Sequence, residues 1–541
     1  MHTRADDDSL IHISWTLAEE FQVSKMRSKA GRQMAGSYLL GIDIGTSGCK
    51  MAIFRKDGQA VCQVTEPYDT FSPLAGYVEQ DPNDWWRAVC TGIQRMLAEA
   101  GIRSSDVACI GVDGQSWSAL PVDKRGNALR KAIIWLDTRA SQECEQIEQT
   151  VGEERIFAIA GNRLAPGYTT GKILWLKAHE PDVYRQTFKF LQSNSFIVYK
   201  LTGQFTQDLS QGYGIHAFNV STGRWDDALC AQMGIDRELL PDIYACSDVV
   251  GELTAEAARA CGLKAGTPVV AGGLDSACAT LGIGAISPGQ VQEQGGQSGG
   301  MSIVMDEAQR DKNLILGYHV VADTWLLQGG TVGGGSLKWL RRELAKEFSS
   351  ASDEAFFATV NREAASVPPG SDGVIFLPYM AGERSPLWDI HAKGVFLGLS
   401  YDKSRAHMIR AVMEGCAFAL QHNLMTAQAA GVAVHELYST GGAGNSHVWT
   451  QMKADITGKI IKVPTMASDK ATALGAAMLA GIGVGIYADF QDAVQHTACS
   501  HRIHTPDANL RSAYGRQYEL YLETYERLKD LFPRLGLDDH A

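Results

Sequence analysis

The stretch GIDIGTSGCK, residues 41–50, constrains the fold of this chain more than any other segment. An apolar run, 38–42, ends in Asp43 and opens into a turn of glycines and small hydroxyl residues, 45–48, after which apolar residues resume at 51–54. Two apolar runs joined by a glycine turn predict a β-hairpin. The unusual element is the carboxylate at the end of the first strand, directly before the turn.

The residues that follow extend this hairpin into a mixed sheet. A third apolar run at 61–64 predicts another strand, and the pair Asp81-Pro82 predicts the start of a helix that reaches about Ala100. Further apolar runs at 107–112 and 132–135 predict strands, with a helix after Thr138. Three strands, a helix, and then strands alternating with helices are typical of an α/β sheet covered on its faces.

A second copy of the hairpin lies about 250 residues later. Aligning DIGTSGCKMAIF, 43–54, with QGGQSGGMSIVM, 294–305, superimposes Gly45 on Gly296, Ser47 on Ser298 and Gly48 on Gly299. One such match is weak, because glycine and serine are common in turns. The spacing strengthens it and predicts two similar α/β domains around a central cleft. The turn signal Ser287-Pro288-Gly289 places their boundary near residue 289.

Composition narrows the classes of protein that remain. A chain of 541 residues, 45% hydrophobic and 20% charged, is long enough for two or more domains. Its formal net charge of -12 disfavours nucleic acid or an anionic membrane as a partner. No apolar run reaches the roughly 18 residues of a membrane span. The 11 cysteines form no CxxC pair and predict free thiols in a cytoplasmic protein, and residues 1–36 are predicted to be a disordered extension.

The glycine turn has a chemical interpretation beside its structural one. It is not a Walker A loop or a dinucleotide fingerprint, since no Gly-Lys-Ser/Thr closes it and a strand follows it. Bare backbone at a hairpin tip can aim N–H groups at phosphate oxygens. Lys50 would add a positive charge, and Asp43 would hold Mg²⁺ through water. Taken alone, the segment is better explained as an ordinary hairpin.

Three segments, the glycine turn among them, carry a family resemblance. DIGTSGCK resembles the first phosphate loop of the actin and sugar-kinase ATPase superfamily. GVFLGLSYDKSRAHMIRAVME, 394–414, is similar to the second signature of the FGGY carbohydrate kinases in the spacing of Gly394, Gly398, His407, Ala411 and Glu414. GYTTGKILWLKAH, 167–179, nearly matches the first signature, with Lys172 and Trp175 in place and Ala178 where the family has a polar residue. The resemblance covers about residues 38–530 and is nearest to the xylulokinase branch.

The resemblance implies a fold and a set of site residues. The fold would be two actin-like (ribonuclease-H-like) ATPase domains, with sugar binding and the first phosphate loop in 37–289 and nucleotide binding in 290–541. Asp275 in GGLDSACATLG would be the catalytic base, with sugar contacts from Gln115, Ser116, Trp117, Asp137 and Ser276. Asp43 would be the metal site. ATP would contact Gly45, Thr46, Ser47, Gly48, Lys50, Gln297, Gly334, Lys338, Gly441, Gly442 and Asn445. The segment LPYMAGERSPLWD, 377–389, is given no chemistry.

The implied activity is ATP-dependent phosphorylation of a small ketose, with ATP, Mg²⁺ and the sugar as the ligands and a homodimer compatible with it. D-xylulose, converted to D-xylulose 5-phosphate, is the leading substrate; ribulose, L-xylulose and polyols stay open. Ser116 and Trp117 replace a family Met-His pair, Ser276 replaces an Asn, and Gln297 replaces a Thr, so the resemblance leaves the identity of the sugar open. A non-metabolic actin-like ATPase and a sugar sensor without catalysis are the alternatives, against which the family signatures and the presence of Asp43 and Asp275 argue.

Several residues have structural alternatives. Asp275 lies where a strand end meets a helix start, and a helix cap is the commoner role of an aspartate there; as a base it would work near its normal pKa of about 4. Trp117 is as readily a core residue as a sugar contact. The cluster His496, Cys499, His501 and His504 has spacings that a metal could use, but a surface strand is the preferred interpretation. Trp85 is expected in the core, and 509–531 as a packing helix.

Overall fold

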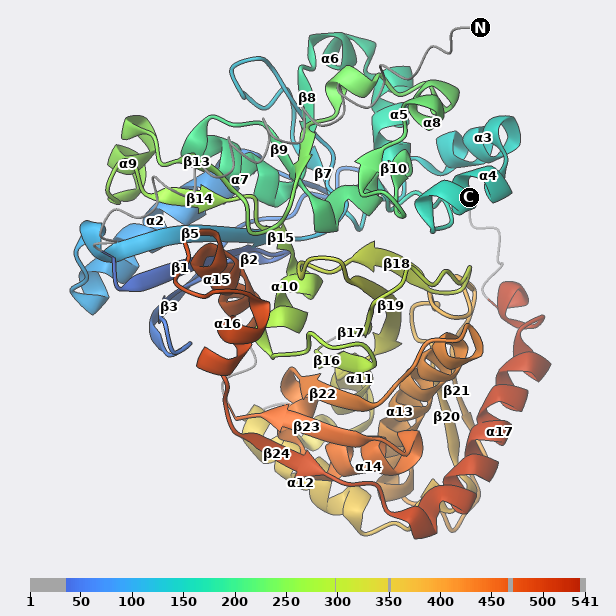
Figure 1. Ribbon diagram of the computed structural model, residues 1–541. Coiled ribbons are helices and arrows are strands. Elements are labelled where there is room, and N and C mark those ends of the chain that lie inside the picture. Colours follow the sequence, from blue (N-terminus) through green and yellow to red (C-terminus); the bar gives the residue numbers. More distant parts are fainter. Residues whose placement is uncertain (1–35, 297, 349–351, 466–469, 536–541) are drawn as a thin grey trace, which may run out of the picture.

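Two seven-stranded sheets, one in each half of the chain, organise the fold (Figure 1). The computed structural model describes residues 36–296, 298–348, 352–465 and 470–535. The predicted extension up to residue 35 and the predicted nucleotide contact Gln297 therefore lie outside the described residues. In Figure 1 the first sheet lies above the second, and α10 and α15 lie between them.

The first sheet has the order β13-β14-β5-β1-β2-β3, with β15 also paired to β5. β1 (Tyr38–Ile44), β2 (Gly48–Arg55) and β3 (Ala60–Pro67) form the predicted antiparallel series, and β5 (Val107–Gly114) runs parallel to β1. β13 (Val249–Glu252), β14 (Pro268–Val270) and β15 (Gly273–Leu274) complete it. The helix predicted from Asp81-Pro82 is α2 (Pro82–Ala100), whose N-cap Asp81 accepts a hydrogen bond from the Asn83 amide. Trp85 on this helix is fully buried, as predicted.

The second sheet repeats this pattern in the order β18-β19-β17-β16-β22-β23-β24. β16 (Gln290–Gly295), β17 (Ser298–Met305) and β19 (Trp325–Val332) are antiparallel, and β22 (Glu436–Thr440) runs parallel to β16 as β5 does to β1. β18 (Ile315–Tyr318) and β24 (His501–His504) are the edge strands, and β23 (Ile460–Pro464) lies between β22 and β24. The repeat predicted from the two glycine turns is thus present in the sheet topology, and the predicted fold class is confirmed.

Between β5 and β14 the chain builds a layer of short elements. The strand predicted at 132–135 is shorter than expected: β7 covers only Ala132–Ile133, because the chain turns at Trp135. The helices of this layer are α3 (Ser141–Val151), α4 (Glu153–Ala160), α5 (Thr169–His179), α6 (Pro181–Gln186), α7 (Ser193–Thr202), α8 (Asp227–Met233) and α9 (Ala255–Cys261). Its short strands and single turns include β6 (Leu120–Val122), β8 (Lys189–Leu191), β9 (Thr206–Asp208), β10 (Phe218–Asn219), β11 (Arg224–Trp225), β12 (Asp242–Tyr244) and η2 (Leu209–Gly214). β4 (Glu79–Gln80), which precedes α2 in the chain, pairs with β7.

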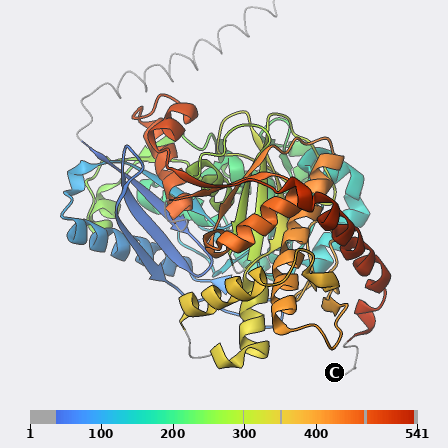
Figure 2. The same ribbon diagram turned by 90° about the horizontal axis from the view of Figure 1, so that it is seen from below.

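The helices of the second half lie on and around its sheet. They are α11 (Gly335–Leu344), α12 (Asp353–Ala365), α13 (Arg405–Ala429), α14 (His447–Thr457) and α17 (Arg511–Leu528), with β20 (Ile375–Pro378) and β21 (Gly394–Leu397) beside α13. The yellow pair α11 and α12 lies at the edge of the molecule in Figure 2. α17 buries Tyr514, Tyr521 and Tyr525, so the predicted packing helix is confirmed.

Helices α10 (Asp275–Gly282) and α15 (Ala471–Gly483) pack directly against each other and against the first sheet. Glycines permit this approach. A Cβ atom built on Gly41 of β1 would lie 1.9 Å from the carbonyl oxygen of Ala473, and one on Gly111 of β5 would lie 1.9 Å from that of Ala476. α15 therefore belongs to the later half of the chain and yet covers the sheet of the earlier half (Figure 1).

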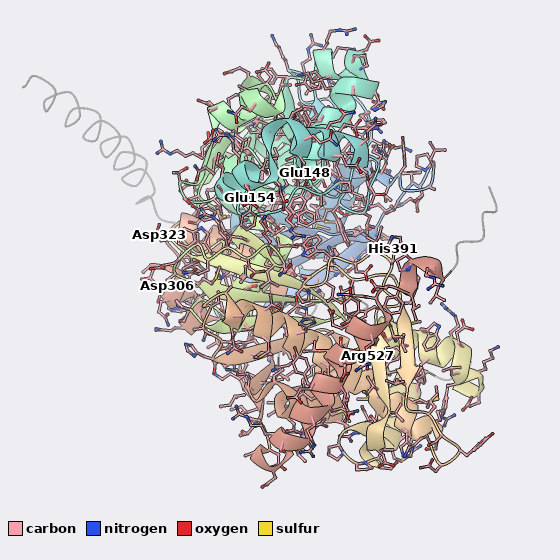
Figure 3. All side chains as sticks on the ribbon, turned by 90° about the vertical axis from the view of Figure 1, so that its right-hand side faces the viewer. Glu148, Glu154, Asp306, Asp323, His391 and Arg527 are labelled. Carbon is pink, nitrogen blue, oxygen red and sulfur yellow. The ribbon has the colours of Figure 1, made fainter. Side chains whose placement is uncertain are left out.

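All 11 cysteines are free, as predicted, and eight of them are buried. Acidic side chains such as Glu154, Asp306 and Asp323 lie exposed on the outside of the protein (Figure 3). Within the part of the chain that the structure describes, no helix is both long and apolar enough to span a membrane.

Candidate functional site

Three aspartates and one lysine meet at the carboxyl end of the first sheet. Asp43 at the end of β1 stands opposite Lys50 of β2 and beside Asp113 of β5. Asp113 in turn lies beside Gly273 of β15, two residues before Asp275. Asp43 and Asp113 are buried, whereas Asp275 keeps part of its surface accessible. Asp43, Lys50 and Asp275 were predicted from the sequence, whereas Asp113 was not.

The crowding of carboxyl groups changes their acidity. Burial raises the pKa of Asp43 and, together with the charges of Asp43 and Asp275, raises the pKa of Asp113 well above its usual range. Burial and the charge of Asp43 raise the pKa of Asp275 to about 7, against the opposing effects of the Ser276 amide and Lys50. The expected pKa of about 4 for Asp275 was therefore wrong, because the sequence shows neither its burial nor its acidic neighbours. A carboxylate with a pKa near neutrality is suited to act as a general base.

Asp275 does not act as the helix cap that its position suggested. Leu274 occupies the N-cap position of α10, and Asp275 is the first helical residue. Its Oδ1 accepts a hydrogen bond from the Ser276 amide at 2.6 Å. The carboxylate is thus held in place by its own helix start.

The tip of the first hairpin is held through its carbonyl groups. The Tyr68 hydroxyl donates to the Gly45 carbonyl at 2.5 Å, and Gln80 Nε2 donates to the Thr46 carbonyl at 2.6 Å. In a trans peptide the N–H group points away from the carbonyl of the same peptide unit. The amides of Thr46 and Ser47 therefore point away from Tyr68 and Gln80, as a phosphate-binding turn requires.

The predicted sugar loop is connected to this hairpin. Gln115 is buried, its Nε2 donates to Gln80 Oε1 at 2.7 Å, and its Oε1 accepts from the Thr46 hydroxyl at 3.4 Å. Trp135 Nε1 also donates to the Thr46 hydroxyl, at 3.0 Å. Ser116 beside Gln115 is half-buried. The structure thus brings Gln115 and Thr46, predicted for different ligands, into one network.

Trp117 forms part of an aromatic wall. Its ring stacks on Tyr168 with centroids 4.0 Å apart, and it meets Tyr213 edge-on at 6.0 Å. Its backbone has φ 58°, a left-handed conformation that is strained for a bulky residue. Lys172 Nζ donates to the Trp117 carbonyl at 2.8 Å and to the Gly167 carbonyl at 2.6 Å. Through these two hydrogen bonds this family-signature lysine supports the backbone around Trp117. Burial lowers the pKa of Lys172 to about 7.

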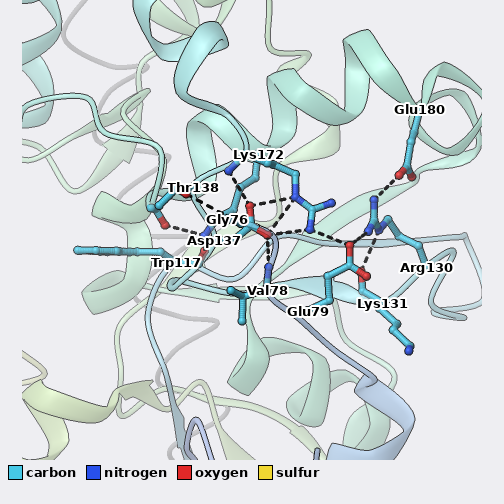
Figure 4. A network of polar contacts seen from close by, with 12 residues as sticks. Gly76, Val78, Glu79, Trp117, Arg130, Lys131, Asp137, Thr138, Lys172 and Glu180 are labelled. Atoms are coloured by element: carbon cyan, nitrogen blue, oxygen red, sulfur yellow. Dashed lines mark hydrogen bonds and ion pairs between the residues drawn. The ribbon is translucent and has the colours of Figure 1, made fainter. Parts of the chain in front are cut away.

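The Asp137 carboxylate is engaged by protein groups (Figure 4). Its Oδ2 accepts from the Val78 amide at 2.5 Å, and Arg139 forms an ion pair with it at 2.7 Å. Arg139 also pairs with Glu79 at 2.8 Å. The side chain is fully buried. The contacts of Asp137 are thus with Val78 and Arg139, and its charge acts on Lys172, which donates to the Trp117 carbonyl. A direct contact of Asp137 with the sugar stays a prediction.

The glycine segments of the second half converge in the same way. The Gly334 amide donates to the Gly296 carbonyl at 2.6 Å, next to the tip of the β16–β17 hairpin. A Cβ atom on Gly441 would lie 2.7 Å from the Gly295 carbonyl oxygen. Arg502 of β24 donates to the Gly444 carbonyl. The predicted nucleotide residues Gly334 and Gly441 are thus neighbours; Gly442, Asn445 and Lys338 are exposed around them.

The histidines of 496–504 do not form one site. His501 and His504 lie on strand β24, as the preferred interpretation predicted, and His504 Nδ1 pairs with Gln451 Oε1 at 3.1 Å. His496 lies on α16 (Phe490–His496) and contacts Asp492 at 3.1 Å. Across the described ranges no group of three His, Cys, Asp or Glu side chains is arranged to hold a metal ion.

Two similar sheets, with a glycine hairpin on each, define a two-domain protein of the actin-like fold class. The chain belongs to the FGGY family of carbohydrate kinases: the N-terminal domain model of that family matches residues 38–282 and the C-terminal domain model matches 296–484. The family predicted from the sequence is confirmed, and with it an ATP-dependent sugar phosphotransferase.

Relatives of known name agree with this family. The chain is 30% identical over 498 residues to the xylulose kinase of Bacillus subtilis (strain 168), covering 91% of this chain and 98% of that protein. It is 32% identical over 495 residues to the xylulose kinase of Escherichia coli (strain K12), covering 91% and 99%. Among solved structures, the xylulose kinase from Rhodospirillum rubrum superposes with a TM-score of 0.84 at 29% identity, over 92% of this chain and 99% of that one.

Proposed function

We propose that this enzyme transfers the γ-phosphoryl group of ATP to a hydroxyl of D-xylulose and forms D-xylulose 5-phosphate. The observation that carries the proposal is the position of Asp275. Asp275 is half-buried, the charges of Asp43 and Lys50 of the first hairpin act on its carboxylate, and its neighbour Ser276 contacts the second sheet through Gln328. The named relatives above support xylulose as the sugar. A relative at 27% identity, the gluconokinase of Bacillus licheniformis, makes gluconate a second candidate.

In the proposed reaction the hydroxyl oxygen of the sugar bonds to the γ-phosphorus, and Asp275 accepts the proton of that hydroxyl. The bond from that phosphorus to the β–γ bridging oxygen breaks, and ADP leaves. The transition state is loose, so the enzyme acts mainly by positioning and charge neutralisation. The amides of Thr46, Ser47 and Gly48, with Lys50 and Lys338, would face the phosphates, and the backbone at Gly334 would line the same site. Gly441, Gly442 and Asn445 would face the adenosine, and Gln297 stays a predicted contact.

The carboxylates of the site fit a magnesium ion. The charge of Asp43 raises the pKa of Asp275, which means that the two ionised groups repel each other. A divalent cation near Asp43 would offset this repulsion. Mg²⁺ binds nucleotide phosphates and keeps several waters, so we propose that Asp43 holds it through water. When bound, Mg²⁺ neutralises charge on the transferred group.

Residues 37–289 would bind the sugar, through Gln115, Ser116, Trp117 and Ser276, with Asp137 holding the loop. Residues 290–541 would bind the nucleotide. α15 packs on the first sheet, so this division follows the sites and not every contact. We propose that the enzyme is cytoplasmic and acts on small molecules. That it forms a homodimer, and that it binds neither nucleic acid nor membranes, are predictions.

A coupled assay of ADP formation across ketoses, polyols and gluconate tests the proposal. D-xylulose is expected to give the highest kcat/KM. Asp275→Ala should abolish sugar-dependent ADP formation and leave nucleotide binding nearly intact. Asp226→Ala, which removes a helix-capping aspartate of α8, is the matched control and should keep its turnover. Near wild-type turnover in Asp275→Ala would contradict the assignment of Asp275 as the base. A higher kcat/KM on another substrate would make that substrate, and not D-xylulose, the proposed sugar.

A further inference from the structure

Gln328 of β19 connects the two halves of the protein by side-chain hydrogen bonds. Its Nε2 donates to the Ser276 hydroxyl at 2.9 Å and to the Ser302 hydroxyl of β17 at 3.3 Å. Its Oε1 accepts from the Tyr213 hydroxyl at 3.4 Å. Ser276 follows the proposed base, and Tyr213 belongs to the aromatic wall around Trp117. One half-buried amide of the second sheet therefore contacts both the base region and the proposed sugar pocket.

The strand that carries Gln328 leads directly to the proposed nucleotide site. β19 ends at Val332, and Gly334 then donates to Gly296 at the tip of the second hairpin. A side chain at position 328 and the glycine loop at 333–334 are thus joined by a few residues of extended backbone. At about 3.4 Å per residue, the two ends lie about 20 Å apart along the strand.

This part of β19 is fixed against its neighbours. Asn423 of α13 donates to the Gly330 carbonyl at 2.9 Å, and the Gly330 amide donates to the Ser385 hydroxyl at 2.5 Å. A Cβ atom on Gly329 would lie 2.3 Å from Asn423 Oδ1, so a larger residue there would displace the Asn423 side chain. The strand therefore transmits the position of the nucleotide loop to Gln328 with little freedom to slide.

We propose that Gln328 is a positioning residue for phosphoryl transfer, which holds the Asp275–Ser276 turn of the first half in register with the nucleotide loop of the second half. This inference rests on the proposed function. The base and the phosphoryl donor would come from different halves, and misplacement by about 1 Å can cost about 100-fold in rate. The Ser276 amide also holds Asp275 Oδ1 at 2.6 Å, so a shift of Ser276 turns the carboxylate.

Gln328→Met tests the inference, because methionine keeps the length of the side chain and removes both hydrogen-bonding groups. We expect kcat to fall about 10- to 100-fold, while the KM for the sugar and the Kd for the nucleotide change little. Ser276→Ala removes the partner group, and the double variant should be no slower than Gln328→Met alone, since both changes break one link. Gln517→Met on α17 is the matched control, a buried glutamine of the second half outside the site, and should keep its kcat.

The outcomes separate this inference from the proposed function. An unchanged kcat in Gln328→Met, or a double variant in which the losses in kcat simply multiply, would overturn the positioning role. If Asp275→Ala is inactive in that same experiment, the kinase assignment stands alone. An active Asp275→Ala would overturn the proposed function itself. Should Gln328→Met not fold, Gln328→Asn, which keeps the amide but withdraws it by one methylene, is expected to show the same loss of kcat.

Discussion

The acidity of Asp275 predicts how activity depends on pH. Burial and the charge of Asp43 raise the pKa of Asp275 to about 7, and the proposed base must be ionised to accept a proton. Activity is therefore lost as pH falls through 7. Below the pKa each unit of pH lowers the ionised fraction tenfold, so kcat/KM for the sugar should fall to about a tenth at pH 6 and about a hundredth at pH 5.

Removing the charge of Lys50 should shift the acid limb of the pH profile, the range in which kcat/KM falls with falling pH, in a known direction. The Lys50 ammonium lowers the pKa of Asp275, so Lys50→Met should raise it further and shift the acid limb to higher pH. Lys56→Met, at an exposed position in the loop after β2, is the control and should leave the limb in place. The assay is kcat/KM for the sugar from pH 5 to pH 9, with ADP measured after quenching. An acid limb near pH 4 in the wild type, or one that Lys50→Met leaves unmoved, would refute the reasoning.

Three further predictions concern the loop and the cleft. Trp117→His should change the preference among ketopentoses with little effect on ATP affinity, measured as kcat/KM across the sugar panel; an unchanged profile in a stable variant would make Trp117 a core residue only. Lys172→Met should leave the buried Trp117 carbonyl and the half-buried Gly167 carbonyl without this donor, the buried one costing about 1–3 kcal/mol in unfolding free energy, and should raise the sugar KM; unchanged thermal unfolding would contradict this. Sugar plus nucleotide should reduce the radius of gyration in X-ray scattering through domain closure, and identical curves with and without ligands would exclude it.

The sheets were predictable because their signals are local. Each hairpin is marked by alternating apolar residues and a glycine turn, and the start of α2 is marked by Asp81 and Pro82. The spacing of apolar residues, together with the residues that begin turns and helices, is enough to predict these elements. The strand predicted at 132–135 is longer than the observed β7, because the apolar run in the sequence continues after the backbone has turned. Composition cannot show where a backbone leaves the sheet.

The site was predictable only in part, because its main contacts span long distances in sequence. Asp113 carries the same local signal as Asp43, an acid at the end of an apolar strand just before a glycine or a turn, and that signal could have found it. Its effect on Asp43 and Asp275 depends on the parallel register of β1, β5 and β15, which the sequence does not show. Gln328 lies 52 residues from Ser276 and 115 from Tyr213. No local pattern relates residues so far apart.

The glycine contacts of α10 and α15 indicate where motion between the two halves is confined. Gly282 of α10 and Gly475 of α15 each approach a carbonyl oxygen of the other helix so closely that an added Cβ would lie 1.9 Å from it. Gly41 and Gly111 bring the first sheet equally close to α15. Backbones packed at this distance cannot slide without clashes, because no flexible side chain lies between them. The helix pair therefore serves as the fixed end of any closing motion, and the hairpin tips are the parts free to approach the substrates.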